Sequence, residues 1–131
     1  MGLKLDLLMN ASCYGRVGFS RYLVNLVGSI VAHLWDIVGL DAVTTRSPLI
    51  ARTVKQDFPG IDVRASVNMR LGTVKAFQYV ADLFDSFYLQ REYNRDIERI
   101  EELKEWCERA GKGLYMLANS GCLNFCSVQP R

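Results

Sequence analysis

Three of the chain's four cysteines stand where they could act as metal ligands. Cys122 and Cys126 are four residues apart in a glycine-containing segment, and Cys13 follows the first apolar run of the chain. If the fold brings these loops to one end of the molecule, three thiolates would suit an iron–sulfur cluster, or else a zinc ion. The alternative is that the loop thiols merely pack. The fourth cysteine, Cys107, lies on the apolar stripe of a predicted helix, which is typical of a buried thiol.

Polar side chains that could bind a substrate also come directly after the apolar runs. In an alternating β/α protein such positions lie at the carboxyl ends of parallel strands, where loops open and helix N-termini present free N–H groups. Each has a structural alternative: Asn94 and Ser47 could simply cap helices, and Arg95 could be solvated. Besides the cysteines, these residues are Asn10, Ser12, Thr45, Arg46, Ser47, Ser66, Asn68, Arg70, Glu92, Asn94, Arg95, Asn119 and Asn124.

The elements that would position these residues are strands and helices in alternation. Strands are predicted at 3–9, 41–45, 62–67, 86–89 and 113–118, where short apolar or β-rich runs are bounded by turn residues. Helices are predicted at 20–39, 47–57, 72–82 and 94–110, with Asn94 as the cap of the last. Strands that alternate with helices through short loops give right-handed crossovers and a parallel sheet.

The fold class is therefore α/β, and residues 1–131 are expected to form a single domain. Two architectures fit the pattern, an open doubly wound sheet and a TIM-type (β/α)8 barrel. A barrel needs eight units and about 250 residues, whereas five units are predicted here. The barrel interpretation makes this chain the N-terminal part of a larger barrel, while an open sheet could be complete.

The composition supports a folded core but indicates no partner by charge. Of the 131 residues, 50% are hydrophobic, and 16 basic against 14 acidic residues leave a net charge of +2. That charge is too small to predict binding to nucleic acid or to an anionic membrane. The N-terminus does not have the order of a secretory signal peptide, so we expect a cytoplasmic protein with reduced thiols.

The apolar segment 22–40 is close to the length of a membrane-spanning helix. Polar residues interrupt it at spacings of four, four and three, which places them on one narrow stripe of a helix. They are Asn25, Ser29, His33 and Asp36. An Asp and a His within the segment argue against a membrane span. We therefore expect no membrane insertion, and a helix that is buried on most sides.

The residues themselves give little support to hydrolytic chemistry. His33 is the only histidine and falls in the middle of a predicted helix, so it cannot pair with a serine or cysteine after a strand. The sequence has no HExxH zinc motif, and the spacing of Gly15 and Gly18 is too short for a phosphate-binding loop. Glu92 is the carboxylate that could act as a base at the predicted site.

Four segments together resemble the peptidase U32 family. They are LLMNASCYG at 7–15, DAVTTRSPLIARTVKQDFPGIDVRASV at 41–67, NRDIERIEELKEWCE at 94–108 and LYMLANSGCLNFC at 114–126. The last is the most specific, because it is similar to the NxGCLxxCP segment of U32-like proteins, although Ser127 stands where the proline usually follows. The resemblance implies a (β/α)8-type barrel. Members are named as collagenase-like peptidases, and several resemble oxygen-independent hydroxylation factors with cysteine-bound iron–sulfur clusters.

Residue by residue, the resemblance implies that Cys122 and Cys126 are paired cluster ligands and that Cys13 is a third. In the leading interpretation, the chain is the N-terminal part of an iron–sulfur enzyme that hydroxylates or similarly modifies its substrate. Arg95 would clamp an anionic group at the catalytic site, together with Asn94. The substrate-binding residues would be Asn10, Ser66, Asn68 and Asn119.

The expected substrate is an RNA base, a small aromatic compound or a peptide. The open edges of a partial barrel could also associate with one another or with a related barrel subunit. Two other functional classes stay open, a U32-type peptidase and a non-catalytic or truncated scaffold in which the thiols only pack.

Overall fold

Five parallel strands form one sheet in a computed structural model that describes residues 2–11 and 13–118. The strands are β1 (Asp6–Met9), β2 (Ala42–Thr45), β3 (Asp62–Ala65), β4 (Ser86–Tyr88) and β5 (Gly113–Tyr115). Each strand pairs with the next one in the chain, in the order β1-β2-β3-β4-β5, and all four pairings are parallel. The predicted α/β class with a parallel sheet is confirmed.

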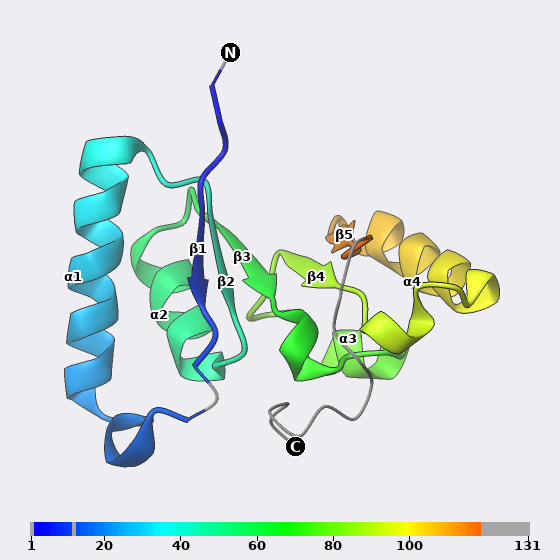
Figure 1. Ribbon diagram of the computed structural model, residues 1–131, viewed down its shortest axis with the longest axis horizontal. Coiled ribbons are helices and arrows are strands. Elements are labelled where there is room, and N and C mark those ends of the chain that lie inside the picture. The colour runs from blue at the N-terminus through cyan, green and yellow to red at the C-terminus, as the bar shows by residue number, and fades with distance from the viewer. Residues whose placement is uncertain (1, 12, 119–131) are drawn as a thin grey trace.

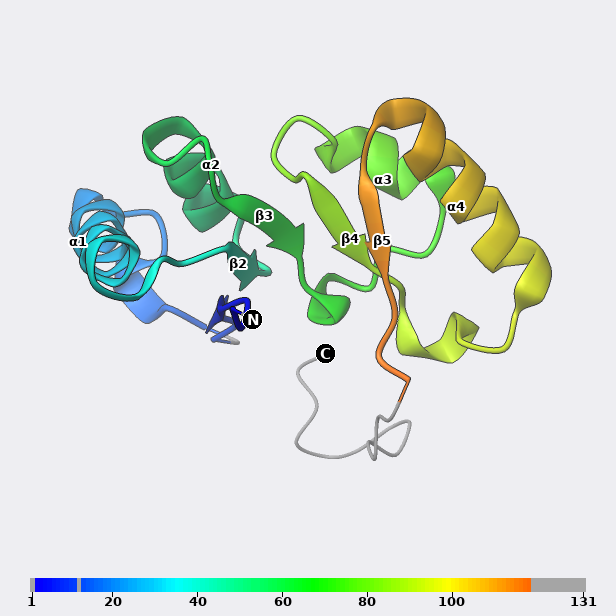
Figure 2. The ribbon, with the colours of Figure 1, turned by 90° about the horizontal axis from the view of Figure 1, so that it is seen from above.

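Four helices connect the strands: α1 (Arg21–Val38), α2 (Pro48–Asp57), α3 (Val74–Val80) and α4 (Ile97–Ala110). Short 3₁₀ turns η1 (Gly15–Val17), η2 (Val67–Met69) and η3 (Arg91–Tyr93) follow β1, β3 and β4. Figure 2 shows all four helices on one side of the curved sheet. A doubly wound sheet would reverse its strand order and carry helices on both faces, so the architecture is a partial, unclosed (β/α) barrel.

The core lies between the helices and the outer face of the sheet, because alternate strand residues point toward the helices. Val43, Val63 and Phe87 are fully buried there. Phe77 of α3 stacks on Phe87 with ring centroids 4.2 Å apart, and Trp106 of α4 meets Phe87 edge-on at 6.0 Å. Each helix therefore contacts the sheet through one apolar stripe.

Side-chain caps fix where the helices begin. Ser20, Ser47 and Thr73 each accept a hydrogen bond from the backbone N–H three residues later. The fourth helix differs from the prediction, because Asp96 and not Asn94 is its cap and accepts from the N–H of Arg99. Asn94 instead ends η3, and its side chain contacts a distant carbonyl described below.

The expectation that α1 is buried on most sides is wrong. Leu23, Val27 and Val31 are buried, but several large apolar residues of the same helix are exposed to solvent. They are Tyr22, Leu26, Ile30, Trp35, Ile37 and Val38. Among the residues that the structure describes, no helix is long and apolar enough to cross a membrane.

Candidate functional site

The carboxyl ends of all five strands lie along one rim, at the lower side of the molecule in Figure 1. The turns η1, η2 and η3 follow three of these ends directly. Most of the predicted site residues therefore belong to neighbouring loops, as the sequence pattern indicates. The exceptions are Ser12, Asn119, Cys122, Asn124 and Cys126, which lie outside the described residues.

Hydrogen bonds tie the ends of β1 and β2 together beside Asn10. The carbonyl oxygen of Met9 accepts from the Tyr14 hydroxyl at 2.9 Å and from Thr45 Oγ1 at 2.9 Å. Burial raises the pKa of Tyr14 despite the opposing effects of a backbone hydrogen bond and the Arg46 charge, so its hydroxyl stays a donor. Asn10 Oδ1 is buried here and accepts no hydrogen bond from the described residues.

Cys13 is exposed in the loop that leads into η1. Its Sγ accepts a hydrogen bond from the Gly15 N–H at 3.2 Å. The positive φ of 57° at Gly15 explains the glycine at that position. Cys13 therefore lies on the predicted rim with its thiol accessible to a metal ion or cluster.

The η2 turn after β3 gives Ser66 a structural role. Ser66 is buried, and its Oγ accepts from the backbone N–H of Asn68 at 3.2 Å. The hydroxyl oxygen thus caps the turn, and Asn68 is placed half-buried beside it. Both residues lie on the predicted rim, with Ser66 shaping the loop and Asn68 the more accessible of the two.

Asn94 connects the loop after β4 to the chain after β5. Its Nδ2 donates to the carbonyl oxygen of Leu117 at 2.8 Å, which fixes the amide orientation because a carbonyl can only accept. The other amide atom, Asn94 Oδ1, is buried without a partner in the described structure, and so is Arg91 Nε. Arg95, the predicted anion clamp, is exposed next to them.

A close approach of two loops holds this region in place. Arg99 donates to the carbonyl oxygen of Gly72 at 2.9 Å and stacks its guanidinium 4.4 Å from the centroid of the Tyr93 ring. A Cβ at Gly72 would clash with that ring. Only glycine therefore fits at this contact between the start of the α3 segment and η3.

The buried polar atoms left unpaired within the described residues lie on the same rim, at two places along it. They are Asn10 Oδ1, Arg91 Nε and Asn94 Oδ1, and all follow β1 or β4 on the carboxyl-end rim. Buried polar atoms in native proteins are nearly always satisfied. Two acceptors and one donor at this rim therefore fit a polar ligand or ordered water.

A second polar cluster, on the inner face of the sheet, was missed by the sequence analysis. At its centre Arg64 of β3 donates to Asp62 Oδ2 at 2.6 Å and to Asp6 Oδ2 of β1 at 3.3 Å. The Arg64 guanidinium also lies 4.4 Å from the ring centroid of Tyr115 of β5. Arg64 thus links the two edge strands of the described sheet across its inner face.

Two hydroxyl groups complete this inner-face network. Thr44 of β2 donates to both carboxylate oxygens of Asp6, at 2.8 and 2.9 Å, and Ser86 of β4 donates to Asp62 Oδ1 at 2.8 Å. A Cβ at Gly113 would come within 2.5 Å of Ser86 Oγ, so glycine makes room for this hydroxyl. All five strands contribute to the network, counting Tyr115.

Electrostatics keep Arg64 charged. Burial would lower its pKa, but the hydrogen bond and charge of Asp62, with smaller contributions from Tyr115 and Asp6, offset this and raise it. The sequence did carry a signal, because Asp62 and Arg64 alternate with apolar residues and so share one face of a strand. Asp6 and Asp62 begin their strands, so the network lies toward the amino ends, away from the rim.

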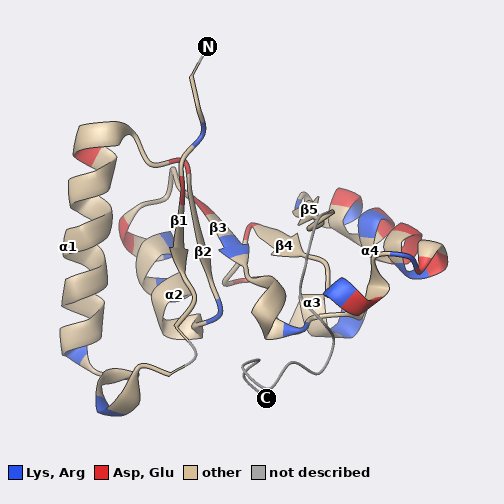
Figure 3. Ribbon diagram, in the orientation of Figure 1, with Lys and Arg blue, Asp and Glu red and all other residues tan. Residues whose placement is uncertain are grey.

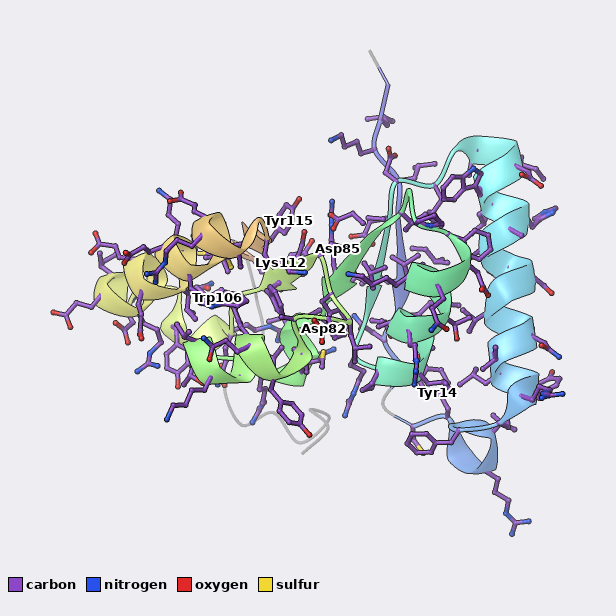
Figure 4. The ribbon with its side chains drawn as sticks, turned by 180° about the vertical axis from the view of Figure 1, so that it is seen from behind. Tyr14, Asp82, Asp85, Trp106, Lys112 and Tyr115 are labelled. Atoms are coloured by element: carbon purple, nitrogen blue, oxygen red, sulfur yellow. The ribbon has the colours of Figure 1, made fainter. Side chains whose placement is uncertain are left out.

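The opposite rim contains a structural lysine cluster. Lys112 donates to the carbonyl oxygens of Ala81 and Phe84, both at 2.8 Å, and burial lowers its pKa. Asp85 lies beside Lys112 (Figure 4) and pairs with Lys55 at 2.7 Å. These contacts close the turn after α3, and none of them reaches the carboxyl-end rim.

Comparisons with known proteins bear on the fold. No protein-family model and no curated protein matches the chain. The structure is similar to that of the U32 peptidase Mk0906, with a TM-score of 0.74 and 18% sequence identity. The likeness covers 87% of this chain and 45% of that one. The chain therefore has a U32-like fold.

A second solved structure, an enolase from Streptomyces coelicolor, matches with a TM-score of 0.41 and 15% identity, over 92% of this chain and 46% of that chain. This likeness is too weak to support an argument. Within residues 2–11 and 13–118, no three side chains of His, Cys, Asp or Glu gather in a way that could hold a metal ion.

Proposed function

We propose that this chain is part of a U32-like iron–sulfur enzyme, with the cluster and the substrate both bound at the carboxyl-end rim. Cys122, Cys126 and Cys13 would hold the cluster. The reaction would be an oxygen-independent hydroxylation or a related modification. The chain spans 45% of the similar U32 structure, so the proposal concerns the part of the site that this chain contributes.

The observation that carries the proposal is the location of the unpaired buried atoms. Asn10 Oδ1, Arg91 Nε and Asn94 Oδ1 all lie on the rim where Cys13 is exposed. An unsatisfied buried polar atom costs about 1–3 kcal/mol, and a ligand that pairs with it removes this cost. A ligand bound at the rim would therefore gain binding free energy by pairing with these atoms.

Cys13 is the proposed cluster ligand that lies within the described residues, and its surroundings suit a metal-bound thiolate. Cys13 is accessible, and its Sγ already accepts an N–H hydrogen bond, as ligand sulfurs do in cysteine-bound clusters. Asn94 holds the carbonyl of Leu117, five residues before Cys122, and so ties the start of the cysteine segment to the rim. When bound, a cluster would supply an electron-transfer centre or an open iron that binds substrate.

The remaining rim residues would orient the substrate. Asn10 and Asn94 present acceptor oxygens, and Asn68 and Asn119 would add amide groups. Ser66 would act by shaping the η2 turn. The exposed guanidinium of Arg95 would bind an anionic group, because its planar fork matches a carboxylate or phosphate. Such a set suits a polar, planar substrate such as an RNA base or a small aromatic compound.

Anaerobic purification tests the cluster directly. The wild-type protein should be brown and should contain iron and acid-labile sulfide, and Cys122→Ser should lose both. Cys107→Ala is the matched control, because that thiol is buried against the core and not on the rim; it should retain the iron. A wild-type protein that stays colourless and iron-free after anaerobic reconstitution would sink the proposal.

Peptide hydrolysis, which the similar structure's name suggests, is less well supported. The single histidine, His33, lies on the exposed side of α1, away from the rim. A histidine-dependent nucleophile therefore cannot be assembled there from this chain.

A further inference from the structure

The C-terminal ends of α1 and α2 enclose a surface pocket that the proposed enzymatic site does not use. Both helices end where the following strands begin, at the upper side of Figure 1 and opposite the carboxyl-end rim. The pocket has a volume of about 400 Å³, and its walls are the C-terminal part of α1, the end of α2 and the turn at 58–60. This volume is within the range of pockets that hold small molecules, about 300–1,000 Å³.

Two aromatic side chains form apolar walls of this pocket. The rings of Trp35 in α1 and of Phe58, which follows α2, have centroids 5.9 Å apart and planes tilted by 35°. Gly60 lets the indole lie against the turn, because a Cβ there would come within 2.8 Å of Trp35 Cη2. Trp35 is nevertheless 38% exposed, so the indole is held in place and stays accessible. Aromatic ring faces, and those of tryptophan above all, attract cations.

Two carboxylates line the same pocket. Asp36 lies in the last turn of α1, and Asp57 is the last residue of α2. Both are exposed, and neither forms a salt bridge with another of the described residues. None of the described residues that line the pocket is basic. Lys55, in the last turn of α2, is already bound to Asp85 at 2.7 Å.

The two helix ends add to the negative potential at the pocket. A helix C-terminus carries a partial negative charge and is stabilised by basic residues in its last turn. The last turn of α1 has no basic residue, and both C-termini carry an aspartate instead. Asp36 and Asp57 should therefore destabilise the free protein slightly, and a cation bound between them would remove this repulsion.

We propose that this pocket binds an aliphatic diamine or polyamine. Its ammonium groups would pair with Asp36 and Asp57, and its methylene chain would lie against Trp35 and Phe58. A ligand with two positive charges matches two carboxylates, and an apolar chain between the charges matches the aromatic walls. A hydrated metal ion would use only the carboxylates. The proposal goes beyond the enzymatic function and does not depend on it, because the pocket lies at the opposite rim.

The pocket does not depend on further barrel units for its walls. It is formed by two consecutive helices of the described chain, and these pack against each other. In a closed barrel, additional strand–helix units would follow β5 and meet β1. The helices α1 and α2 would stay neighbours in such a barrel, so the pocket between their ends would be retained.

Isothermal titration calorimetry at low salt measures the binding. Putrescine should bind at one site, and butylamine, which has the same four-carbon chain but one ammonium group, should bind at least about tenfold more weakly. Asp36→Asn and Asp57→Asn should each weaken putrescine binding by a similar factor. Glu101→Gln is the matched control, because it removes an exposed carboxylate of α4 and should leave the binding unchanged.

The indole N–H signal of Trp35 in nuclear magnetic resonance shows where the ligand binds. The chain has two tryptophans, so Trp106→Phe leaves Trp35 as the single one, and its signal should shift with the same Kd as the calorimetry gives. Asp36→Asn should lose binding although the free protein is at least as stable as the wild type, because an acidic group leaves a helix C-terminus.

Three results would overturn the proposal. The first is neither heat nor a shifted indole signal with putrescine at up to about 10 mM. The second is equal binding of butylamine, which would show that a second ammonium group is not recognised. The third is an equal loss of binding in Glu101→Gln, which would show attraction to the overall charge of the protein and no specific site.

Discussion

The helices α1 and α4 lie at opposite ends of the molecule and present opposite surfaces to solvent. In Figure 3, α1 is almost without charge and α4 is densely charged. Of the 14 residues of α4, eight are Asp, Glu, Lys or Arg, whereas the 18 of α1 include two. Yet each helix buries only a narrow face against the sheet. The difference therefore lies in the outer surfaces, which are charged at α4 and largely apolar at α1.

The two ends are nevertheless built on the same kind of contact with the sheet. Leu23 and Val27 of α1 are buried as tightly as Leu103 and Cys107 of α4. A continuous core connects them through the helices between. Substitutions on the buried face of either helix should consequently lower the free energy of unfolding. Substitutions on the outer faces should have different effects in the two helices.

The largest effect is expected at the buried face of α4. Leu103 has no exposed surface and belongs to the core cluster, so Leu103→Ala should lower the free energy of unfolding by about 3 kcal/mol. Leu23→Ala at the start of α1 is the matched substitution and should cost less, about 2 kcal/mol, because a helix end can relax into the space. Urea denaturation measures both, and a larger loss at Leu23 would contradict this ranking.

Arg64 connects the edge strands β1 and β5 across the inner face of the sheet. Its removal should therefore have the next largest effect on the free energy of unfolding. Arg64→Met keeps the length of the side chain but leaves Asp6 and Asp62 facing each other without a cation. The three side chains are only 14–29% exposed, and we expect a loss of about 2–3 kcal/mol. Arg64→Lys should recover part of it. Unchanged unfolding in Arg64→Met would mean that the network contributes nothing to holding the edge strands together.

The contrast between α1 and α4 was only partly predictable from sequence. Helical periodicity predicted one narrow polar stripe on α1, with the rest of that helix buried, and one apolar stripe on α4; the α4 stripe is confirmed, since Leu103 and Cys107 are buried. The apolar residues outside the stripe of α1 were interpreted as further burial in the chain's own core. Composition cannot distinguish burial in a core from a surface made to contact another molecule, because both need the same side chains.

The candidate site shows the same division. The rim was predictable, because parallel strands place their following loops on one side, and Asn10, Ser66, Asn68 and Asn94 are all found there. The role of Asn94 was not, since its contact with Leu117 joins residues 23 positions apart. The inner-face network was not predicted, because Asp6, Asp62 and Arg64 lie within strands and not in the loops that follow them.

The stability of the protein at alkaline pH gives a second test of the buried face of α4. Burial raises the pKa of Cys107 from 9.0 to about 11, so the unfolded chain loses this proton first. Its contribution to stability is present below pH 9 and is lost as pH rises through 11. Lys112, whose pKa burial lowers, acts in the opposite sense.

The net loss between pH 8 and pH 11 should be about 1–2 kcal/mol. Cys107→Ala should show a flatter pH dependence than the wild type in urea denaturation under reducing conditions. Parallel curves for the two proteins would contradict the raised pKa. At pH 8 the same thiol should react with iodoacetamide far more slowly than Cys13, which is exposed.

The smallest effect is expected on the outer face of α4. Lys104 and Glu108 lie 3.7 Å apart with side chains 65% and 66% exposed, so Lys104→Gln should change the free energy of unfolding by less than about 0.5 kcal/mol. Added salt should alter even this difference very little, because water already screens the pair. A loss above about 1 kcal/mol would show that the charged surface of α4 holds structure and does not merely face solvent.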